Sequence, residues 1–262
     1  QALSARELAS TAALSISQLE RLFSGRLKLS VRRLVLWQRL RVALHLALSG
    51  ASLTEAALAA GFAECDGLKL YDSAVLFGPE GLLGHYRKAH LWNQEKLWFT
   101  PGDLGFPVFE TPIGRIGLLI CWDIWFPEVP RILSQQGADI ICSVNNWVWT
   151  PPPLFDEAGK CMASYLTMTA AHVNNVFIAA ASRIGEERDA RYLGCSLIAG
   201  TNGWPIGAVA SANRQEILFA DIDITSARSA PIWNSLNDLQ RDRRNDLYDQ
   251  MLGYSQHPAL PR

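Results

Sequence analysis

The stretch that decides the fold class is residues 113–128, which read I-G-R-I-G-L-L-I-C-W-D-I-W-F-P-E. Its first half contains a short apolar run, Ile116–Cys121, and its second half turns aromatic and acidic. The sequence therefore predicts a buried strand that ends in a turn. Cys121 stands at the end of that strand, where a thiol can act as a nucleophile. A lone cysteine after Leu-Leu-Ile is also an ordinary core residue, so both interpretations stay open at this point.

Short runs rich in Val, Ile and Leu recur on both sides of this stretch. Turn-forming residues separate these runs, and helical stretches lie between them. The alternation of strands and helices predicts an α/β layered fold, ending in a surface extension at Arg241–Tyr248. The other predicted strands are Ser73–Phe77, Asp139–Val144, Val176–Ala181 and Ile217–Ile222, and the predicted helices are Glu128–Gln136 and Glu157–His172.

Residues 1–60 differ from the rest in both charge and periodicity. They contain eight Lys and Arg against three Glu, a charge of +5, whereas the remainder has 16 basic and 22 acidic residues, a charge of −6. Apolar spacing and capping residues predict helices throughout, with a short helix, a turn and a second helix over residues 3–23. Such a layout is that of a helix-turn-helix, with a generic helical bundle as the alternative. The later helices are predicted at Val31–Leu48 and Leu53–Ala60.

The composition favours a folded globular protein and argues against a membrane span, a secretory signal and a metal site. With 49% hydrophobic and 19% charged residues in 262, the chain is expected to fold around a sizeable core. We expect no membrane span and no secretory signal, since no apolar run reaches about 18 residues and no basic segment leads into an apolar one. The five cysteines are odd in number and form no C-x-x-C pair, and the histidines lack ligand spacing. A cytoplasmic protein without metal or cofactor is expected.

Residues 3–63 resemble the DNA-binding module of the AraC/XylS family of transcription regulators. The matching text is A-R-E-L-A-S-T-A-A-L-S-I-S-Q-L-E-R-L-F (5–23), W-Q-R-L-R-V-A-L (37–44) and L-T-E-A-A-L-A-A-G-F-A (53–63). The resemblance implies two helix-turn-helix units joined by a long helix that contacts DNA phosphates. After G-F-A, however, the sequence reads E-C-D-G-L-K-L-Y, which suits a turn into a strand, so the second recognition helix is missing. The implied DNA-binding residues are Ser17, Gln18 and Arg21 on the first recognition helix and Arg32 and Arg33 on the linker.

Residues from Gly61 to about 250 resemble the nitrilase superfamily of carbon–nitrogen hydrolases. Its motifs occur in order: G-F-A-E-C-D-G-L-K-L-Y-D-S-A-V (61–75), Y-R-K-A-H-L-W (86–92), E-K-L-W-F-T-P-G-D (95–103), the stretch around Cys121, A-D-I-I-C-S-V-N-N-W (138–147), N-N-V-F-I-A-A-A-S-R-I-G (174–185) and R-R-N-D-L-Y (243–248). The resemblance implies an α-β-β-α sandwich that forms homo-oligomers. It implies Cys121 as nucleophile with Lys88 and Glu95 as catalytic partners, and Trp122, Asn146 and Trp147 at the oxyanion and substrate pocket. Without the resemblance, Lys88 and Glu95 would be surface residues, the tryptophans core residues, and Cys65, Cys142, Cys161 and Cys195 core cysteines.

The chemistry of a thioester mechanism explains these residue types. Cys121 would attack an amide carbonyl or a nitrile carbon, and the Lys88 ammonium with the Trp122 N–H would stabilise the developing oxyanion. We expect the same ammonium to lower the pKa of the thiol. A carboxylate base must also move the thiol proton to the departing amine and then activate water.

The family's base glutamate has no counterpart in this sequence. It would lie upstream of Gly61, where Glu7, Glu20 and Glu55 belong to the helix-turn-helix pattern, and Glu64 belongs to the hairpin motif. The first strand and its helices are also missing, so we expect very slow turnover or none. We predict two incomplete domains, residues 1–60 and 61–262, joined in frame at the string Gly61–Phe62–Ala63 that fits both families.

The predicted function is therefore hydrolysis of a non-peptide carbon–nitrogen bond. The sequence Cys121-Trp122-Asp123 resembles the amidase and carbamoylase branches more than the nitrilases, while the particular amide or nitrile cannot be read. The alternative is a DNA-binding regulator that uses residues 1–60 weakly and carries the hydrolase part as a sensor or passenger.

Overall fold

The computed structural model describes residues 44–46, 57–78, 81–148, 151–187, 190–228 and 236–252. Ser17, Gln18, Arg21, Arg32 and Arg33 lie outside these residues. The chain divides into two compact units, residues 1–228 and 229–262. In the second unit, helix α8 (Asn245–Leu252) occupies part of the predicted surface extension. Within the described residues, no helix combines the length and apolar character that crossing a membrane requires.

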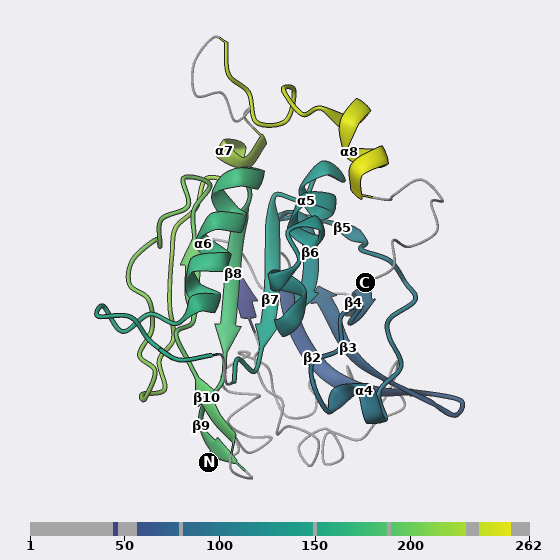
Figure 1. Cartoon of the computed structure of the whole chain (residues 1–262), viewed down its shortest axis with the longest axis vertical. Coiled ribbons are helices and arrows are strands. Elements are labelled where there is room, and N and C mark those ends of the chain that lie inside the picture. Colours follow the sequence, from purple (N-terminus) through teal and green to yellow (C-terminus); the bar gives the residue numbers. More distant parts are fainter. Residues whose placement is uncertain are drawn as a thin grey trace. The chain divides into compact units, whose positions relative to one another are not determined.

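A five-stranded sheet forms the centre of the first unit (Figure 1). Its three middle strands, β6 (Gly114–Ile120), β7 (Ile140–Asn145) and β8 (Phe177–Ser182), are parallel, with Leu118 opposite Cys142 and Cys142 opposite Ala179. The outer strands β5 (Val108–Thr111) and β11 (Leu197–Ala199) pair antiparallel with β6 and β8. Every residue of β7 is buried, as expected for a parallel strand that is covered on both faces.

A second sheet of four antiparallel strands is a meander in chain order. It consists of β1 (Leu44–Leu46), β2 (Ala57–Asp66), β3 (Lys69–Gly78) and β4 (Gly81–Arg87). The predicted turn after residue 66 is confirmed: Asp66 pairs with Lys69 across a two-residue turn, and Gly67 has φ 60°, which glycine adopts without strain.

Two helix predictions are wrong where this sheet begins. Leu44–Leu46 and Ala57–Ala60 were expected in the helices Val31–Leu48 and Leu53–Ala60, but both segments are strands. Residues 58–66 pair continuously with β3, and Ala57 and Ala59 are 2% and 1% exposed. Strand pairing and burial outweigh the helix propensity of this alanine-rich segment. The helix propensity of alanine exceeds that of other ordinary residues by only about 0.5 kcal/mol per position.

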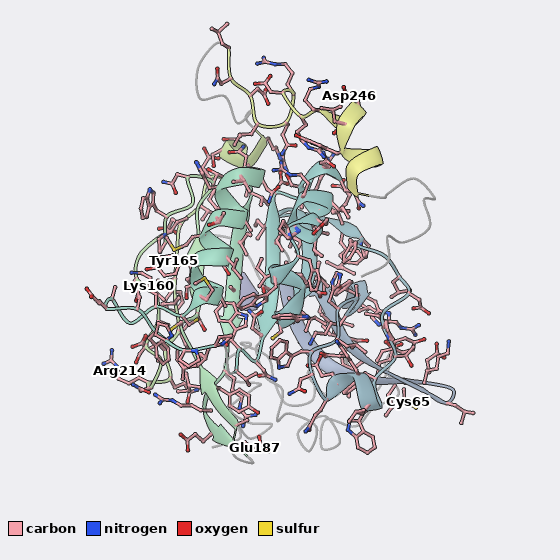
Figure 2. The ribbon with its side chains drawn as sticks, in the orientation of Figure 1. Cys65, Lys160, Tyr165, Glu187, Arg214 and Asp246 are labelled. Atoms are coloured by element: carbon pink, nitrogen blue, oxygen red, sulfur yellow. The ribbon has the colours of Figure 1, made fainter. Side chains whose placement is uncertain are left out.

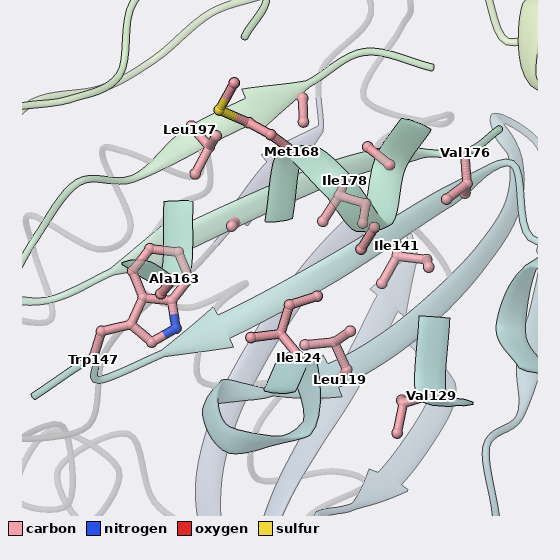
Figure 3. Packing of buried hydrophobic residues seen from close by; sticks show 14 of the residues in the cluster. Leu119, Ile124, Val129, Ile141, Trp147, Ala163, Met168, Val176, Ile178 and Leu197 are labelled. Atoms are coloured by element: carbon pink, nitrogen blue, oxygen red, sulfur yellow. The ribbon is translucent and has the colours of Figure 1, made fainter. Parts of the chain in front are cut away.

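The layers are held together by two apolar clusters. Helices α5 (Glu128–Gln135) and α6 (Met162–Asn174) cover one face of the five-stranded sheet, and Figure 3 shows Leu119, Ile141 and Ile178 from the sheet among the residues packed there. The opposite face packs against the four-stranded sheet, where Ala74 and Leu76 of β3 meet residues of β6 and β7. In the described part of the chain, no helix makes a broad contact with β2, β3 or β4.

The remaining sequence predictions have mixed outcomes. The strands predicted around β3, β6, β7 and β8 and the helix at α5 are confirmed, and α6 begins five residues later than predicted. The strand predicted at Ile217–Ile222 is wrong: no strand forms there, and Ile217 and Phe219 are 70% and 85% exposed. Cys65 is exposed near the end of β2 rather than in the core (Figure 2). The smaller elements are α4 (Glu95–Trp98), the 3₁₀ helix η1 (Cys121–Trp125), the hairpin β9 (Ile184–Glu187) with β10 (Ala190–Leu193), and α7 (Thr225–Arg228).

Candidate active site

Cys121 occupies a sharp turn between a strand and a helix. Strand β6 ends at Ile120, η1 begins at Cys121, and the backbone of Cys121 has φ 47°. A residue other than glycine in this left-handed region costs on the order of 1–3 kcal/mol, and such strain concentrates at functional sites. The backbone N–H of Asn146, just beyond neighbouring strand β7, hydrogen-bonds the Cys121 sulfur.

A buried carboxylate, that of Asp123, holds this turn in place. It accepts hydrogen bonds from the backbone N–H of Ile120 (3.0 Å) and the Tyr86 hydroxyl (2.8 Å). It also accepts one from the backbone N–H of His90 (3.1 Å), whose ring Nδ1 lies 2.8 Å away. Burial and the charge of Asp123 raise the pKa of Tyr86, so its hydroxyl remains a donor. Asp123 therefore ties the end of β6 to the end of β4 and to the residues that follow it.

Lys88 is a buried cation held between two carboxylates. It directly follows β4 and is only 1% exposed. Its Nζ lies 2.6 Å from Glu95 Oε2 and 3.2 Å from Asp72 Oδ2. Burial acts to lower the pKa of Lys88, but the carboxylates of Asp72 and Glu95, and Cys121 when it is ionised, outweigh burial and raise the pKa above its ordinary value. Lys88 is therefore a permanent ammonium.

Glu95 has a fixed position at the start of α4. Its Oε2 accepts hydrogen bonds from the Lys88 ammonium and from the backbone N–H of Trp92 (2.7 Å). The same oxygen thus receives two donors, which orients both the lysine and the loop that precedes α4.

Lys88, Glu95, Cys121 and Asn146 meet at one small cavity of about 30 Å³ between the two sheets. This volume accommodates roughly two or three water-sized groups. The other lining residues are Gly61 from β2, Asp72 from β3, Ile120 from β6, and Val144 and Asn145 from β7. The structure therefore brings together three predicted catalytic side chains and one predicted pocket residue.

The side chains of Trp122 and Trp147 lie outside the cavity, while the expected oxyanion donor is the backbone N–H of Trp122, which directly follows Cys121. The Trp122 ring packs at a tilt against Trp92, at 4.2 Å between ring centroids, and against Trp125, at 5.1 Å. Trp147 is 3% exposed and belongs to the cluster between the five-stranded sheet and its helices (Figure 3). Neither side chain lines the cavity as formed by the described residues.

The electrostatic environment of Cys121 differs from the expectation. Burial raises the pKa of the Cys121 thiol to about 11, although the Lys88 ammonium opposes this rise. Lys88 thus lowers the pKa as expected, but the net pKa is raised because desolvation of a thiolate in this cavity outweighs the attraction of one cation. The thiol keeps its proton near neutral pH, so a base must remove that proton as the sulfur attacks.

Asp72 also lines the cavity, and the sequence analysis did not name it. Burial raises its pKa to about 6, against the opposing charge of Lys88. A signal was available, because side chains two residues apart in a strand share a face. Asp72 lies on the same face of β3 as Ala74 and Leu76, which pack against the five-stranded sheet. The sequence alone could therefore show an aspartate on an otherwise apolar inner face.

Comparisons with known proteins agree with both resemblances. A sequence model of the carbon–nitrogen hydrolase family matches residues 48–232, and a helix-turn-helix domain model matches residues 8–68. The chain is 41% identical over 191 residues to a nitrilase of Pyrococcus abyssi, covering 73% of this chain and 68% of that relative. It is 33% identical to a citrullinase of Francisella tularensis, covering 74% and 70%. The crystal structure of a carbon–nitrogen hydrolase from Helicobacter pylori matches with 30% identity and a TM-score of 0.64, covering 76% and 71%.

Proposed function

The chain belongs to the carbon–nitrogen hydrolase family, and from that premise we propose that it hydrolyses a small amide or carbamoyl compound through a thioester on Cys121. The observation that carries this proposal is the cavity in which the strained Cys121 turn, the buried Lys88 ammonium and Glu95 come together. Relatives that bear the names nitrilase and citrullinase support the reaction class.

The proposed reaction has two stages. The Cys121 sulfur attacks the carbonyl carbon, and the new C–S bond leaves the carbonyl oxygen negatively charged. The Lys88 ammonium and the backbone N–H of Trp122 stabilise this oxyanion. The C–N bond then breaks, and ammonia or an amine departs with one added proton. Water next adds to the thioester, the C–S bond breaks, and the thiol is formed together with a carboxylic acid from an amide or a carbamic acid from a carbamoyl compound.

An unpaired acceptor on a residue that lines the cavity favours a substrate that has an N–H group. Asn146 lines the cavity, and its buried Oδ1 has no hydrogen-bond partner among the described residues. An amide or carbamoyl nitrogen can donate to this oxygen, whereas a nitrile has no proton to donate. The cavity volume fits a carbonyl group and its leaving nitrogen, so amides and carbamoyl compounds are preferred over nitriles in this proposal.

Ammonia release tests this proposal directly. Acetamide, methylurea and acetonitrile are incubated with the full chain, and we expect ammonia from the first two in preference to the nitrile. Cys121→Ala should reduce the rate to background, while the exposed Cys65→Ala should leave it unchanged. Hydrolysis that persists in Cys121→Ala, or the absence of any adduct on Cys121 with an activated ester, would contradict the proposal.

A second function is proposed for residues 1–60. The helix-turn-helix match over residues 8–68 and the charge of +5 favour weak, salt-sensitive DNA binding, with Ser17, Gln18 and Arg21 reading bases and Arg32 and Arg33 contacting phosphates. A mobility-shift assay between about 50 and 200 mM salt should show a steep loss of affinity. Tight binding selective for one sequence at physiological salt would mean that a second recognition element exists.

Domain division and assembly are also proposals. The two family models overlap at residues 48–68, and the proposed boundary between residues 1–60 and 61–262 falls inside this overlap. By the family resemblance we propose a homo-oligomer, which light scattering of the purified chain would test.

A further inference from the structure

Two carboxylates line the cavity beside Cys121, and the reaction needs one of them as a base. The thiol must lose its proton as it attacks, the departing nitrogen must gain one, and the water that opens the thioester must lose one. Asp72 and Glu95 are the carboxylates in the lining, and both contact the Lys88 ammonium.

Glu95 is already committed to a structural arrangement. Its Oε2 accepts two short hydrogen bonds, 2.6 Å from Lys88 Nζ and 2.7 Å from the backbone N–H of Trp92. A proton on this oxygen would displace one of these donors and detach Lys88 or the loop before α4. Glu95 Oε2 therefore positions Lys88 and this loop, and only Oε1 is left to exchange a proton.

Asp72 has fewer fixed contacts than Glu95, whose Oε2 holds two donors. Its contact with Lys88 is longer, at 3.2 Å, and among the described side chains Lys88 is its single ion-pair partner. A carboxylate has about four acceptor sites, so lone pairs remain for a thiol or a water molecule. The position of Asp72 is fixed by the backbone, since its carbonyl accepts the N–H of Lys88 at 2.8 Å.

We infer that Asp72 is the general base of this site. It takes the Sγ proton of Cys121 as the C–S bond forms and gives that proton to the nitrogen as the C–N bond breaks. It then removes a proton from the water that attacks the thioester and returns this proton to the sulfur. No oxidation occurs, and the sum is an amide and water converted to an acid and an amine. This inference rests on the proposed thioester mechanism.

The charges around Asp72 suit this role. The Lys88 ammonium after β4 favours its ionised form, while burial and the carboxylates of Glu95 on α4 and Asp123 on η1 disfavour it. The resulting pKa of about 6 leaves Asp72 ionised at neutral pH and still acidic enough, once protonated, to donate to a departing amine. If Asp72 acts in this way, the very slow turnover expected from the sequence is replaced by measurable turnover.

The test compares Asp72→Asn with Asp221→Asn, an exposed aspartate used as the matched control. Steady-state hydrolysis of acetamide and mass spectrometry of the acyl adduct with p-nitrophenyl acetate are measured on the full chain. We expect Asp72→Asn to lose about 10²–10⁴-fold in turnover and to accumulate the acyl group on Cys121. Asp221→Asn should behave as wild type. In wild type, kcat/KM should fall as the pH drops through about 6.

The possible outcomes distinguish a failure of the inference about Asp72 from a failure of the proposed hydrolase function. Turnover of Asp72→Asn within about twofold of wild type, or a wild-type rate that is level between about pH 5 and 8, overturns the inference and leaves Cys121 chemistry standing. A wild-type enzyme that forms the adduct but never releases it also overturns the inference. Wild type with neither adduct nor ammonia overturns the proposed function itself. The wild-type pH profile decides the matter even where Asp72→Asn does not fold.

Discussion

The two sheets that enclose the cavity are built on different patterns. The five-stranded sheet has parallel central strands that are apolar on both faces, because helices cover one face and the other sheet covers the second. The four-stranded sheet is antiparallel, and the residues along its strands alternate between an inner and an outer face. Its inner face carries Asp72 and leads to Lys88, while its outer face carries Glu64, His85 and Arg87. The first sheet thus supplies a rigid support for the nucleophile, and the second supplies the charges.

This difference has a physical reason. A charge within a strand buried on both faces would lose its hydration without gaining a partner, at a cost of several kcal/mol. An alternating strand can place a charge beside a counter-charge on one face and leave the other face partly hydrated. Cys121, which is uncharged at rest, comes from the apolar sheet, and the ion pairs of Lys88 come from the alternating sheet.

The largest expected effect follows from removing the cation supplied by the four-stranded sheet. Lys88→Met should lower turnover by about 10²–10³-fold, since the oxyanion loses a charged donor. It should also destabilise the fold by about 3–5 kcal/mol, because Asp72 and Glu95 remain buried without their shared counter-charge. Hydrolysis assays and urea unfolding measure both effects, with the exposed Lys69→Met as control. An active Lys88→Met enzyme would contradict the statement that the four-stranded sheet supplies the charge that the reaction needs.

The next effect concerns the link between the sheets. Asp123→Ala removes the acceptor shared by the N–H of Ile120, the Tyr86 hydroxyl and the N–H of His90. Leaving these buried donors without a partner costs about 1–3 kcal/mol for each, so we expect a loss of about 3–5 kcal/mol in the free energy of unfolding. Chemical denaturation measures it, with Asp221→Ala as control. A loss below about 1 kcal/mol would mean that the Cys121 turn is held without Asp123.

The sequence predicted the apolar sheet better than the alternating one. The apolar runs around β6, β7 and β8 are rich enough in Val, Ile and Leu to predict buried strands. The motifs, which occur in the order expected for the family, predicted Cys121, Lys88 and Glu95 as catalytic residues. Ala57–Ala60 was misread because alanine fits both a helix and a closely packed strand, and pairing with β3 decides between them. Asp123 was missed because its role depends on which distant side chains it meets, whereas Asp72 could have been found from its place on the apolar inner face of β3. The pKa of Cys121 could not be read from the sequence either, since burial sets it.

A pH-dependent effect separates Asp72 from the other buried groups. Its pKa in the folded state, about 6, lies above its ordinary 3.8, so the folded protein binds the proton more tightly than the unfolded chain does. This contribution to stability is therefore full below about pH 4 and is lost as the pH rises towards 6. Asp72→Asn removes this dependence, so relative to wild type the variant should gain at most about 3 kcal/mol between pH 4 and 7. Unfolding at several pH values measures this gain, and a constant difference between the two proteins would contradict it.

The smallest expected effect tests the outer face of the four-stranded sheet. Glu64 accepts hydrogen bonds from Ser73 Oγ (2.7 Å), His85 Nε2 (2.8 Å) and Arg87 Nη2 (2.6 Å), and its side chain is 16% exposed. Burial acts to raise the pKa of Glu64, but Arg87, Ser73 and His85 outweigh it and hold the pKa below its ordinary value. This stability is therefore present above about pH 4.5 and lost as the pH falls through the folded-state pKa.

Glu64→Gln should accordingly cost about 1–2 kcal/mol at pH 7, because the charge-assisted bonds to Arg87 weaken while solvent screens part of the loss. At about pH 3 the cost should shrink, since wild-type Glu64 then approaches its protonated form. Turnover should stay within about twofold of wild type, because Glu64 lies on the face away from the cavity. Denaturation at both pH values and an amide hydrolysis assay measure these effects. Glu110→Gln, which breaks an ion pair of a 78% exposed side chain with Arg115, serves as control and should cost below about 1 kcal/mol. If Glu64→Gln abolished turnover without unfolding the protein, Glu64 would belong to the catalytic machinery, and the assignment of the two faces would be reversed.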